Sequence, residues 1–244
     1  MVSIIDNEPC VVCDSRYVLY TRHLQPKRLK SKIASYFCME CQSFFNPSGY
    51  IPSENELKAS VSWHKNVYQN NKAKYQDLLE KLPKCEKIID IGCGIGTLVH
   101  CADQNGILGV GYDLNPWAIE YGVSNFGLDL RAQEWTEQDN EYFDILFCIS
   151  TLEHIERPRR LIASFANAAK RNDAYIYLHV PIINKSHWHL LFEPEKDNLY
   201  FGICGEHVTH FSATGLKTIA TQLNATEFRN VNSHKMSGFL FKFS

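Results

Sequence analysis

The 244-residue sequence has no long hydrophobic run, no strong excess of charge of one sign, no internal repeat and no low-complexity segment. Without about 18 or more consecutive apolar residues, no segment has the length of a transmembrane helix. The first residues, MVSIIDNEPC, have no basic stretch leading into an apolar one, so they lack the pattern of a secretory signal. We therefore expect a cytoplasmic protein that does not enter a membrane.

The formal net charge is −2, from 25 Lys and Arg residues against 27 Asp and Glu residues. Such a balance provides no large positive field, so it does not favour nucleic acid as a partner. One local exception is the basic run from Arg22 to Lys32. This run is typical of a solvated loop, and binding of an anionic substrate is the alternative.

Four of the nine cysteines form two C-x₂-C pairs, Cys10 with Cys13 and Cys38 with Cys41, separated by 24 residues. This spacing is close to that of zinc ribbons, in which two knuckles turn four thiolates toward one ion. Because thiolates fill all four positions, the predicted Zn²⁺ is structural and leaves none open to substrate. Unrelated buried cysteines and a thioredoxin-like redox pair are the alternatives. A redox pair would lie beside a βαβ unit, whereas both pairs precede any such unit.

Short strands are expected between the cysteine pairs, because residues 16–20 and 35–37 are rich in aromatic and β-branched side chains. Prolines, a glycine and polar residues at 47–55 then mark a linker. We therefore divide the sequence into a zinc ribbon at 1–50 and a larger domain at 51–244.

The most informative segment is a glycine-rich loop. Residues 86–97 read EKIIDIGCGIGT, in which an apolar run typical of a buried parallel strand leads into three closely spaced glycines. We expect a helix at 97–104. A second apolar run ends at Asp113, 21 residues after Gly92. Since an acidic residue about 20 positions after such a loop accepts hydrogen bonds from ribose hydroxyls, loop and acid together predict a nucleotide-like cofactor.

An NAD-dependent dehydrogenase would also have a glycine-rich loop, and Asp90 separates the two kinds of site. A carboxylate just before the loop accepts hydrogen bonds from an ammonium group, whereas it repels a pyrophosphate. The sequence therefore favours a cofactor with an aminoacyl group over NAD.

These residues carry a resemblance to a known family. Residues 90–96, DIGCGIG, resemble the first motif of class I S-adenosylmethionine-dependent methyltransferases, and residues 111–113 resemble their second. Residues 143–148 and 152–158 are similar to their fourth strand and the loop after it. The resemblance covers residues 60–244 and implies S-adenosyl-L-methionine as the cofactor.

The resemblance also implies the fold, which is α/β: a doubly wound, Rossmann-like, seven-stranded and mostly parallel sheet whose last strand is antiparallel. A helix around 63–82, with Tyr68, Lys74 and Tyr75, covers the cofactor in related enzymes, although its apolar positions also suit a core helix. Candidate strands occur at 87–91, 107–112, 128–132, 143–149, 174–180, 226–231 and 238–243. The positions that match the family's cofactor site are Asp90, Gly92, Cys93, Gly94, Gly96, Asp113, Leu114, Glu134, Trp135 and Ile149.

Methyl transfer to a hydroxyl needs an aligned nucleophile and a base that removes its proton. The candidate catalytic residues are His154, Glu206 and His207. The last two belong to a segment similar to one in small-molecule and sugar methyltransferases, ahead of a helix at 213–223 with Ser212 as its N-cap. His207 is either a general base or a histidine that orders this segment.

Further alternatives concern the histidines and the acceptor. For His210 a structural role is favoured. A catalytic metal at Glu153 and His154 is a further alternative, because ubiquinone-pathway O-methyltransferases and small-RNA 2′-O-methyltransferases resemble the chain there. Such a metal would need further oxygen or nitrogen ligands.

We expect a methyltransferase that acts on a small-molecule or sugar-like acceptor at oxygen, with carbon and nitrogen as alternatives. An RNA or protein methyltransferase whose ribbon captures the substrate is one competing hypothesis, and a non-catalytic scaffold that binds the cofactor is another. The sequence sets neither the acceptor nor the oligomeric state.

Overall fold

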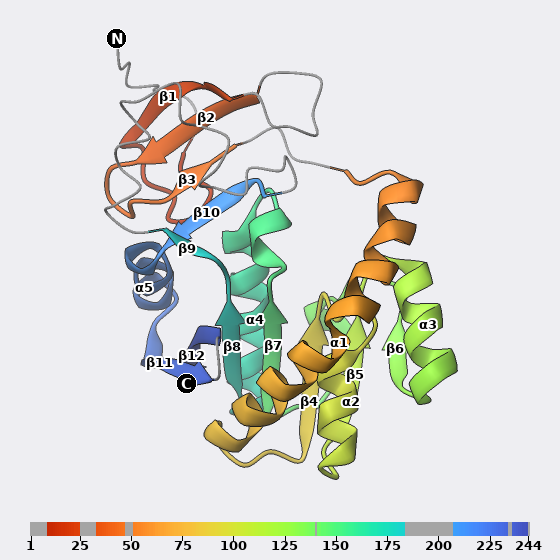
Figure 1. Ribbon diagram of the computed structural model, residues 1–244. Coiled ribbons are helices and arrows are strands. Elements are labelled where there is room, and N and C mark those ends of the chain that lie inside the picture. The colour runs from red at the N-terminus through yellow and green to blue at the C-terminus, as the bar shows by residue number, and fades with distance from the viewer. Residues whose placement is uncertain are drawn as a thin grey trace. The chain divides into compact units, whose positions relative to one another are not determined.

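The computed structural model describes residues 9–24, 33–46, 51–139, 141–183, 207–233 and 236–243 (Figure 1). The chain forms two compact units that are interleaved along the sequence. We call them the ribbon unit and the sheet unit. The ribbon unit consists of Met1–Ile51, Leu152–Ile162 and Val180–Leu223, and the sheet unit of Pro52–Thr151, Ala163–His179 and Asn224–Ser244.

The sheet unit contains a seven-stranded sheet with the strand order β11-β12-β8-β7-β4-β5-β6. Neighbouring strands are parallel except at β12, which pairs antiparallel with both β8 and β11. The predicted seven-stranded, mostly parallel sheet with an antiparallel last strand is therefore confirmed. The strands are β4 (Lys87–Ile91), β5 (Leu108–Tyr112), β6 (Asp129–Arg131), β7 (Ile145–Ile149), β8 (Tyr175–His179), β11 (Ala225–Ser233) and β12 (Met236–Phe243).

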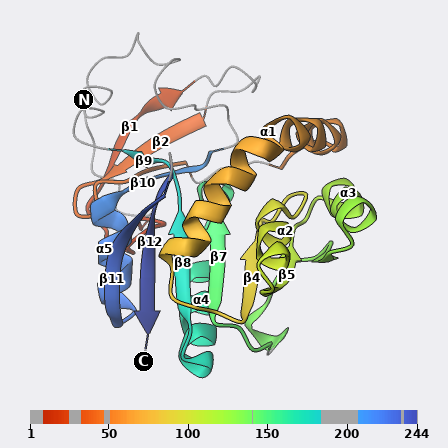
Figure 2. The same cartoon turned by 60° about the horizontal axis from the view of Figure 1, so that its bottom comes forward.

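Helices cover both faces of this sheet, as a doubly wound fold requires. Helix α1 (Glu54–Lys81) and helix α2 (Thr97–Gln104) lie on one face, and α4 (Pro158–Asn172) lies on the other (Figures 1 and 2). Helix α3 (Pro116–Phe126) follows β5. The structure confirms the predicted bounds of α2. None of the described helices is long and apolar enough to cross a bilayer.

Helix α1 begins nine residues before the predicted start at residue 63. Its N-cap is Ser53, whose hydroxyl accepts a hydrogen bond from the Glu56 backbone N–H, while the Glu56 carboxylate accepts one from the Ser53 backbone N–H at 2.8 Å. This reciprocal pair satisfies two amide groups that a helix start otherwise leaves unpaired. The prediction of the start was wrong because it followed the apolar pattern and overlooked this pair.

The core of the sheet unit joins α1, α2 and five strands, β4, β7, β8, β11 and β12. Leu78, Ile88, Leu98, Phe147 and Leu240 are all at most 1% exposed within one apolar cluster. Burial of each such side chain contributes about 1.5–3 kcal/mol. Ile88 of β4 belongs to this cluster, so the strand that leads into the glycine loop is anchored in the core.

The ribbon unit contains a second sheet, with the order β1-β2-β3-β10-β9. Its strands are β1 (Val18–Leu24), β2 (Ile33–Cys38), β3 (Phe44–Phe45), β9 (Ile182–Ile183) and β10 (Thr209–Ser212), and the unit also holds helix α5 (Ala213–Gln222). Strand β1 lies between Cys13 and Cys38 and β2 ends at Cys38, in agreement with the strands predicted near 16–20 and 35–37, whereas β3 follows Cys41. Strands β9 and β10 come from a distant part of the chain, so the ribbon sheet is larger than the predicted one.

Candidate functional site

The glycine-rich loop connects the carboxyl end of β4 to α2. Gly92, Gly94 and Gly96 have φ values of 75°, 56° and 77°, which L-residues with a side chain rarely adopt. The backbone N–H groups of Gly92 and Cys93 both donate to the carbonyl oxygen of Tyr112, at 2.7 and 3.1 Å. These bonds fix the loop against the end of β5. In parallel α/β sheets, ligands bind at this end of the strands.

Asp113 lies directly after β5 and holds the loop. One carboxylate oxygen accepts a hydrogen bond from the Gly94 backbone N–H at 2.8 Å, and the other accepts one from the Asn115 backbone N–H at 2.8 Å. The side chain is half-buried. The two residues that the sequence singled out by their spacing, the loop glycine and the acid, are therefore in direct contact.

Asp90 is 4% exposed at the end of β4. Burial raises the pKa of its carboxyl to about 8, and the negative charge of Asp113 raises it further. The carboxyl is therefore mostly protonated at neutral pH. A cationic group beside it would offset both effects and favour the ionised form.

The first half of α1 lies over the loop, and sequence reasoning missed the residue that makes the contact. A Cβ placed on Gly94 would lie 2.7 Å from Cε1 of His64. Burial lowers the pKa of His64, and the charge of Asp113 partly opposes this shift. The Asn115 side chain donates to the carbonyl oxygen of Leu57 at 2.8 Å, which also holds α1 here. His64 lies four residues before Tyr68 and so on the same helix face, a signal that could have found it.

The end of β7 contributes a second residue that the sequence analysis missed. A Cβ placed on Gly92 would lie 2.1 Å from the Thr151 hydroxyl oxygen, so this side chain touches the loop. The hydroxyl donates to the carbonyl oxygen of Ile149 at 3.2 Å. Thr151 lies two residues after the predicted site residue Ile149, but nothing in its local pattern marks it.

The remaining predicted cofactor residues differ in exposure. Leu114 is 70% exposed, and Glu134 is exposed. Trp135 is buried and packs edge-on against Phe165, with ring centroids 5.4 Å apart. Trp135 therefore helps to anchor the segment after β6, and the exposed Glu134 beside it is free to face a ligand.

The sequence of the chain also matches a protein family model. The sequence profile described as a methyltransferase domain matches residues 63–230, which is more than half of the chain. The chain belongs to the methyltransferase domain family. Its fold is that of class I S-adenosylmethionine-dependent methyltransferases.

Curated relatives and solved structures agree with this family. The ubiquinone biosynthesis O-methyltransferase of Saccharophagus degradans is 28% identical over 93 residues, which are 35% of this chain and 39% of that protein. The chain thus spans about two fifths of the length of this relative. A SAM-dependent methyltransferase from Archaeoglobus fulgidus superposes with a TM-score of 0.57 and 14% identity, covering 75% of this chain and 99% of that one. Human N-acetylserotonin methyltransferase in complex with SAM superposes with a TM-score of 0.59 and 14% identity, and the match covers 79% of this chain and 57% of that one.

A second constellation lies within the ribbon unit. The 3₁₀ turn η2 (Leu152–His154) carries Glu153 and His154, and His207 lies just before β10. One ligand atom of each lies within 4.8 Å of the others. A hydrogen bond from the Val208 N–H to the Glu153 carbonyl oxygen, 2.7 Å long, joins the two segments. The structure brings together two predicted catalytic residues, His154 and His207. The third, Glu206, lies outside the described residues.

Burial shifts the pKa values of the groups in this constellation. Glu153 is 2% exposed, one of its carboxyl oxygens has no hydrogen-bond partner among the described residues, and burial raises its pKa to about 7. Burial, followed by the charge of His154, lowers the pKa of His207 to about 4. His210 is buried, and its pKa is lowered to about 3. His207 is therefore neutral at pH 7 and can accept a proton.

The four N-terminal cysteines form a compact buried cluster. Their sulfur atoms all lie within 4.8 Å of one another, and the Cys10–Cys41 and Cys13–Cys38 sulfur distances are both 3.6 Å. A disulfide would need about 2.05 Å, whereas thiolates around tetrahedral zinc at about 2.3 Å are separated by about 3.8 Å. The donor set and its spacing therefore fit the predicted zinc ion.

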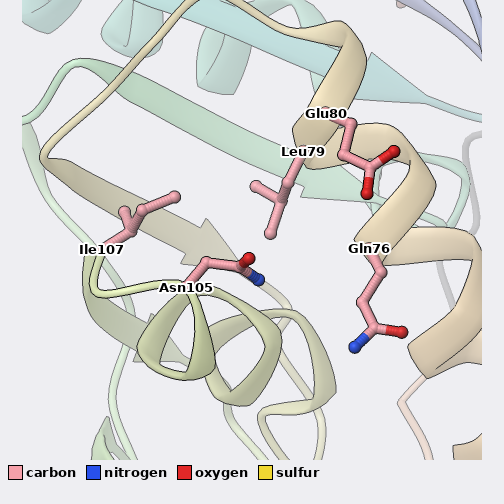
Figure 3. A pocket seen from close by; sticks show the side chains of 5 residues that line it. All are labelled: Gln76, Leu79, Glu80, Asn105 and Ile107. Atoms are coloured by element: carbon pink, nitrogen blue, oxygen red, sulfur yellow. The ribbon is translucent and has the colours of Figure 1, made fainter.

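A cavity of 390 Å³ occurs elsewhere in the sheet unit (Figure 3). Gln76, Leu79 and Glu80 of α1 face Asn105 and Ile107 across it. Residues 105 and 107 lie between α2 and β5, near the amino end of the strand. The glycine loop is at the carboxyl end, so this cavity is separate from the candidate cofactor site.

Replacement of a loop glycine should distinguish the cost of backbone strain from a steric effect on the cofactor site. Gly94→Ala places a side chain at positive φ, at about 1–2 kcal/mol, and drives it into His64. Gly106 is a matched control, because its φ is 72° and its Cβ would meet nothing within 4 Å. We expect thermal denaturation to show a loss of stability in both variants, and calorimetry to show S-adenosylmethionine affinity reduced more than about tenfold only in Gly94→Ala. Equal affinities in both variants would contradict a cofactor site at this loop.

Proposed function

We propose that this chain is an enzyme that transfers the methyl group of S-adenosyl-L-methionine to a small-molecule acceptor at oxygen. The observation that carries the proposal is the contact between Asp113 and Gly94 in a loop preceded by the buried Asp90. In this proposal the loop approaches the methionine part of the cofactor, Asp113 accepts hydrogen bonds from the ribose hydroxyls, and Asp90 binds the ammonium group. Leu114, Glu134 and Trp135 lie on the adenine side, and Ile149 closes the pocket.

The proposed domain division keeps the zinc ribbon at 1–50 and the methyltransferase domain at 51–244. In the structure, the compact ribbon unit adds two stretches of the second domain to the first. One of these stretches starts at Leu152, directly after Thr151 of the cofactor loop contact. The turn that carries His154 therefore follows this contact directly in the sequence.

His207 is the proposed general base, and His154 and Glu206 assist it. A neutral imidazole can take the proton of an acceptor hydroxyl as the oxygen attacks the sulfonium methyl group. The lowered pKa of His207 makes it a weak base. Since a phenol has a pKa of about 10, well below that of an alcohol, the site suits a phenolic or catecholic hydroxyl better than a sugar hydroxyl. The ubiquinone biosynthesis O-methyltransferases among the relatives support an oxygen acceptor.

A second candidate for the same residues is a divalent cation. Glu153, His154 and His207 offer one ligand atom each within 4.8 Å of one another, and the Glu153 oxygen that lacks a hydrogen-bond partner among the described residues could bind a cation. One carboxylate and two imidazoles suit Mn²⁺, Fe²⁺ or Zn²⁺ better than Mg²⁺. Such an ion would polarise an acceptor hydroxyl and lower its pKa.

The decisive experiment is calorimetric titration of the purified chain with S-adenosylmethionine and with NAD, followed by a screen of catechols, phenols and sugars for methyl transfer. Binding of S-adenosylmethionine and turnover with a phenolic acceptor would support the proposal. Binding without turnover on any small molecule would instead favour an RNA or protein substrate or a non-catalytic scaffold. Mn²⁺ added to the assay distinguishes the two candidate roles of His207, because a metal site predicts activation and a simple base does not.

The role proposed for Asp90 predicts a linked proton. The carboxyl has a pKa of about 8 in the folded chain and an ordinary value of 3.8, so the unfolded state binds fewer protons between these values. Without cofactor, this residue therefore lowers stability by about 1.4 kcal/mol per pH unit as the pH rises from 4 to 8. Asp90→Asn should abolish this decline in denaturation midpoints between pH 5 and 8, whereas the exposed control Asp103→Asn should keep it.

Cofactor binding gives the second readout for Asp90. An ammonium group requires the ionised carboxylate, so wild-type protein should release about one proton per S-adenosylmethionine at pH 7, measured by calorimetry in buffers of different ionisation enthalpy. Asp90→Asn should release none and bind more weakly. Proton release that persists in the variant would assign the ammonium contact to another group.

A further inference from the structure

The strand next to His207 is a part of the ribbon sheet. In β10, Thr209 and His210 pair antiparallel with Phe45 and Phe44 of β3, and the Asn46 N–H donates to the carbonyl oxygen of Val208 at 2.8 Å. On its other side β10 pairs with the two residues of β9. Strands β3 and β9 are too short to be stable by themselves. The conformation of the chain at His207 therefore depends on whatever orders β3.

The second cysteine knuckle is connected to the end of β10 through one side chain. The Ser212 hydroxyl donates to the carbonyl oxygen of Cys41 and accepts a hydrogen bond from the Gly215 N–H at 2.8 Å. The Ser212 N–H donates to the Ser43 hydroxyl at 3.2 Å. Ser212, which is 5% exposed, thus joins the knuckle, the end of β10 and the start of α5. The predicted N-cap role is confirmed, and the bond to Cys41 adds to it.

The first knuckle binds the same helix. The carbonyl oxygen of Cys13 accepts a hydrogen bond from the Gln222 side chain at 3.0 Å, at the far end of α5. Asp14, next to this knuckle, also forms an ion pair with Arg159 of α4, with the two atoms 2.5 Å apart. A Cβ on Gly215 would lie 3.2 Å from Val12, so the first turn of α5 also packs against this knuckle. The first knuckle is therefore bonded to the last residue of α5, and the second knuckle to Ser212, the N-cap of the same helix.

We propose that the four-cysteine metal centre positions His207, and that Ser212 is the positioning residue that connects the two. This inference rests on the proposed function for the role of His207. Bound Zn²⁺ fixes the geometry of both knuckles, and without it the four thiols lose their common partner. The knuckles then no longer fix Ser43 and Ser212, and β10 loses the pairing that holds His207. The ribbon thus acts as the support of the catalytic segment and not as a separate substrate-capture module.

Hydrogen exchange of the full chain tests this coupling without an acceptor. We expect removal of zinc by a chelator, verified by metal analysis, to speed exchange in residues 207–212 by about tenfold or more while residues 87–91 of β4 keep their protection. S-adenosylmethionine affinity should stay within about twofold, because its proposed site lies in the sheet unit. Unchanged exchange in residues 207–212 after zinc loss would overturn the inference.

Ser212 variants test the connection with the metal in place. Ser212→Ala should keep one zinc per chain and the wild-type affinity for S-adenosylmethionine, yet lower kcat about tenfold, because small displacements of a catalytic group are costly. Ser212→Thr, which restores the hydroxyl, should recover kcat. The matched control is Thr218→Ala, which removes a hydroxyl of α5 that donates within the helix, to the carbonyl oxygen of Thr214.

The two proposals fail in different ways. If no methyl transfer is found, the proposed function fails, and exchange in residues 207–212 still decides the coupling. If transfer is found but Ser212→Ala and Thr218→Ala have the same kcat and the same exchange as wild-type protein, the coupling is wrong and the proposed function stands.

Discussion

Asp113→Ala should abolish measurable S-adenosylmethionine binding, with a dissociation constant raised by about 100-fold or more. Two hydrogen bonds from the ribose to a carboxylate contribute about 1.5–3 kcal/mol each, and a loss of 2.7 kcal/mol already corresponds to about 100-fold. The substitution also removes the acceptor of the Gly94 and Asn115 N–H groups, so the loop loses the contact that orders it. Isothermal titration of the folded variant measures the effect.

Two further variants separate these contributions. Asp113→Asn keeps one oxygen acceptor without the charge, so its affinity should lie between those of wild-type protein and Asp113→Ala. Asp103→Ala removes an exposed carboxyl of α2 and should bind like wild-type protein. If Asp113→Ala kept an affinity within about threefold of wild type while its fold was intact, the ribose contact would have to be made elsewhere.

Features that depend on a short stretch of sequence could be predicted. The glycine loop, α2 and the acid at residue 113 depend on the spacing of a few residues. In the structure the Gly94 N–H of the loop donates a hydrogen bond to the carboxylate of this acid. The cysteine cluster could be predicted for the same reason, because each C-x₂-C knuckle is formed by a few consecutive residues. The predicted strand positions agree with the sheet to within two residues at every end, and the parallel strands among them are buried and have continuous apolar runs.

Features that depend on contacts between distant segments could not be predicted. Strands β9 and β10 have two and four residues, too few for a periodic pattern, so their place in the ribbon sheet had no local signal. The approach of His207 to Glu153 depends on that pairing. His64 and Thr151 reach the loop from α1 and from the end of β7, and only the packing of these elements shows it.

His207→Ala should lower kcat by at least about 100-fold and leave S-adenosylmethionine affinity unchanged. General bases contribute about 10²–10⁴ in rate, and His207 belongs to the ribbon unit, whereas the proposed cofactor residues belong to the sheet unit. Single-turnover methylation of the phenolic acceptor found in the screen measures the effect. His100→Ala, which changes a histidine of α2 bonded to Tyr68, is the matched control and should retain wild-type kcat.

The pH dependence and chemical rescue then identify what His207 does. The base is active in its neutral form, and its pKa is lowered to about 4, so kcat should stay constant with respect to this group from pH 8 to 5 and decline only as the pH approaches 4. Added imidazole should restore part of the activity of His207→Ala if the residue is a base, because the small molecule replaces the missing proton acceptor. Rescue by Mn²⁺ at high concentration, without any effect of imidazole, would instead assign His207 as a metal ligand together with Glu153 and His154.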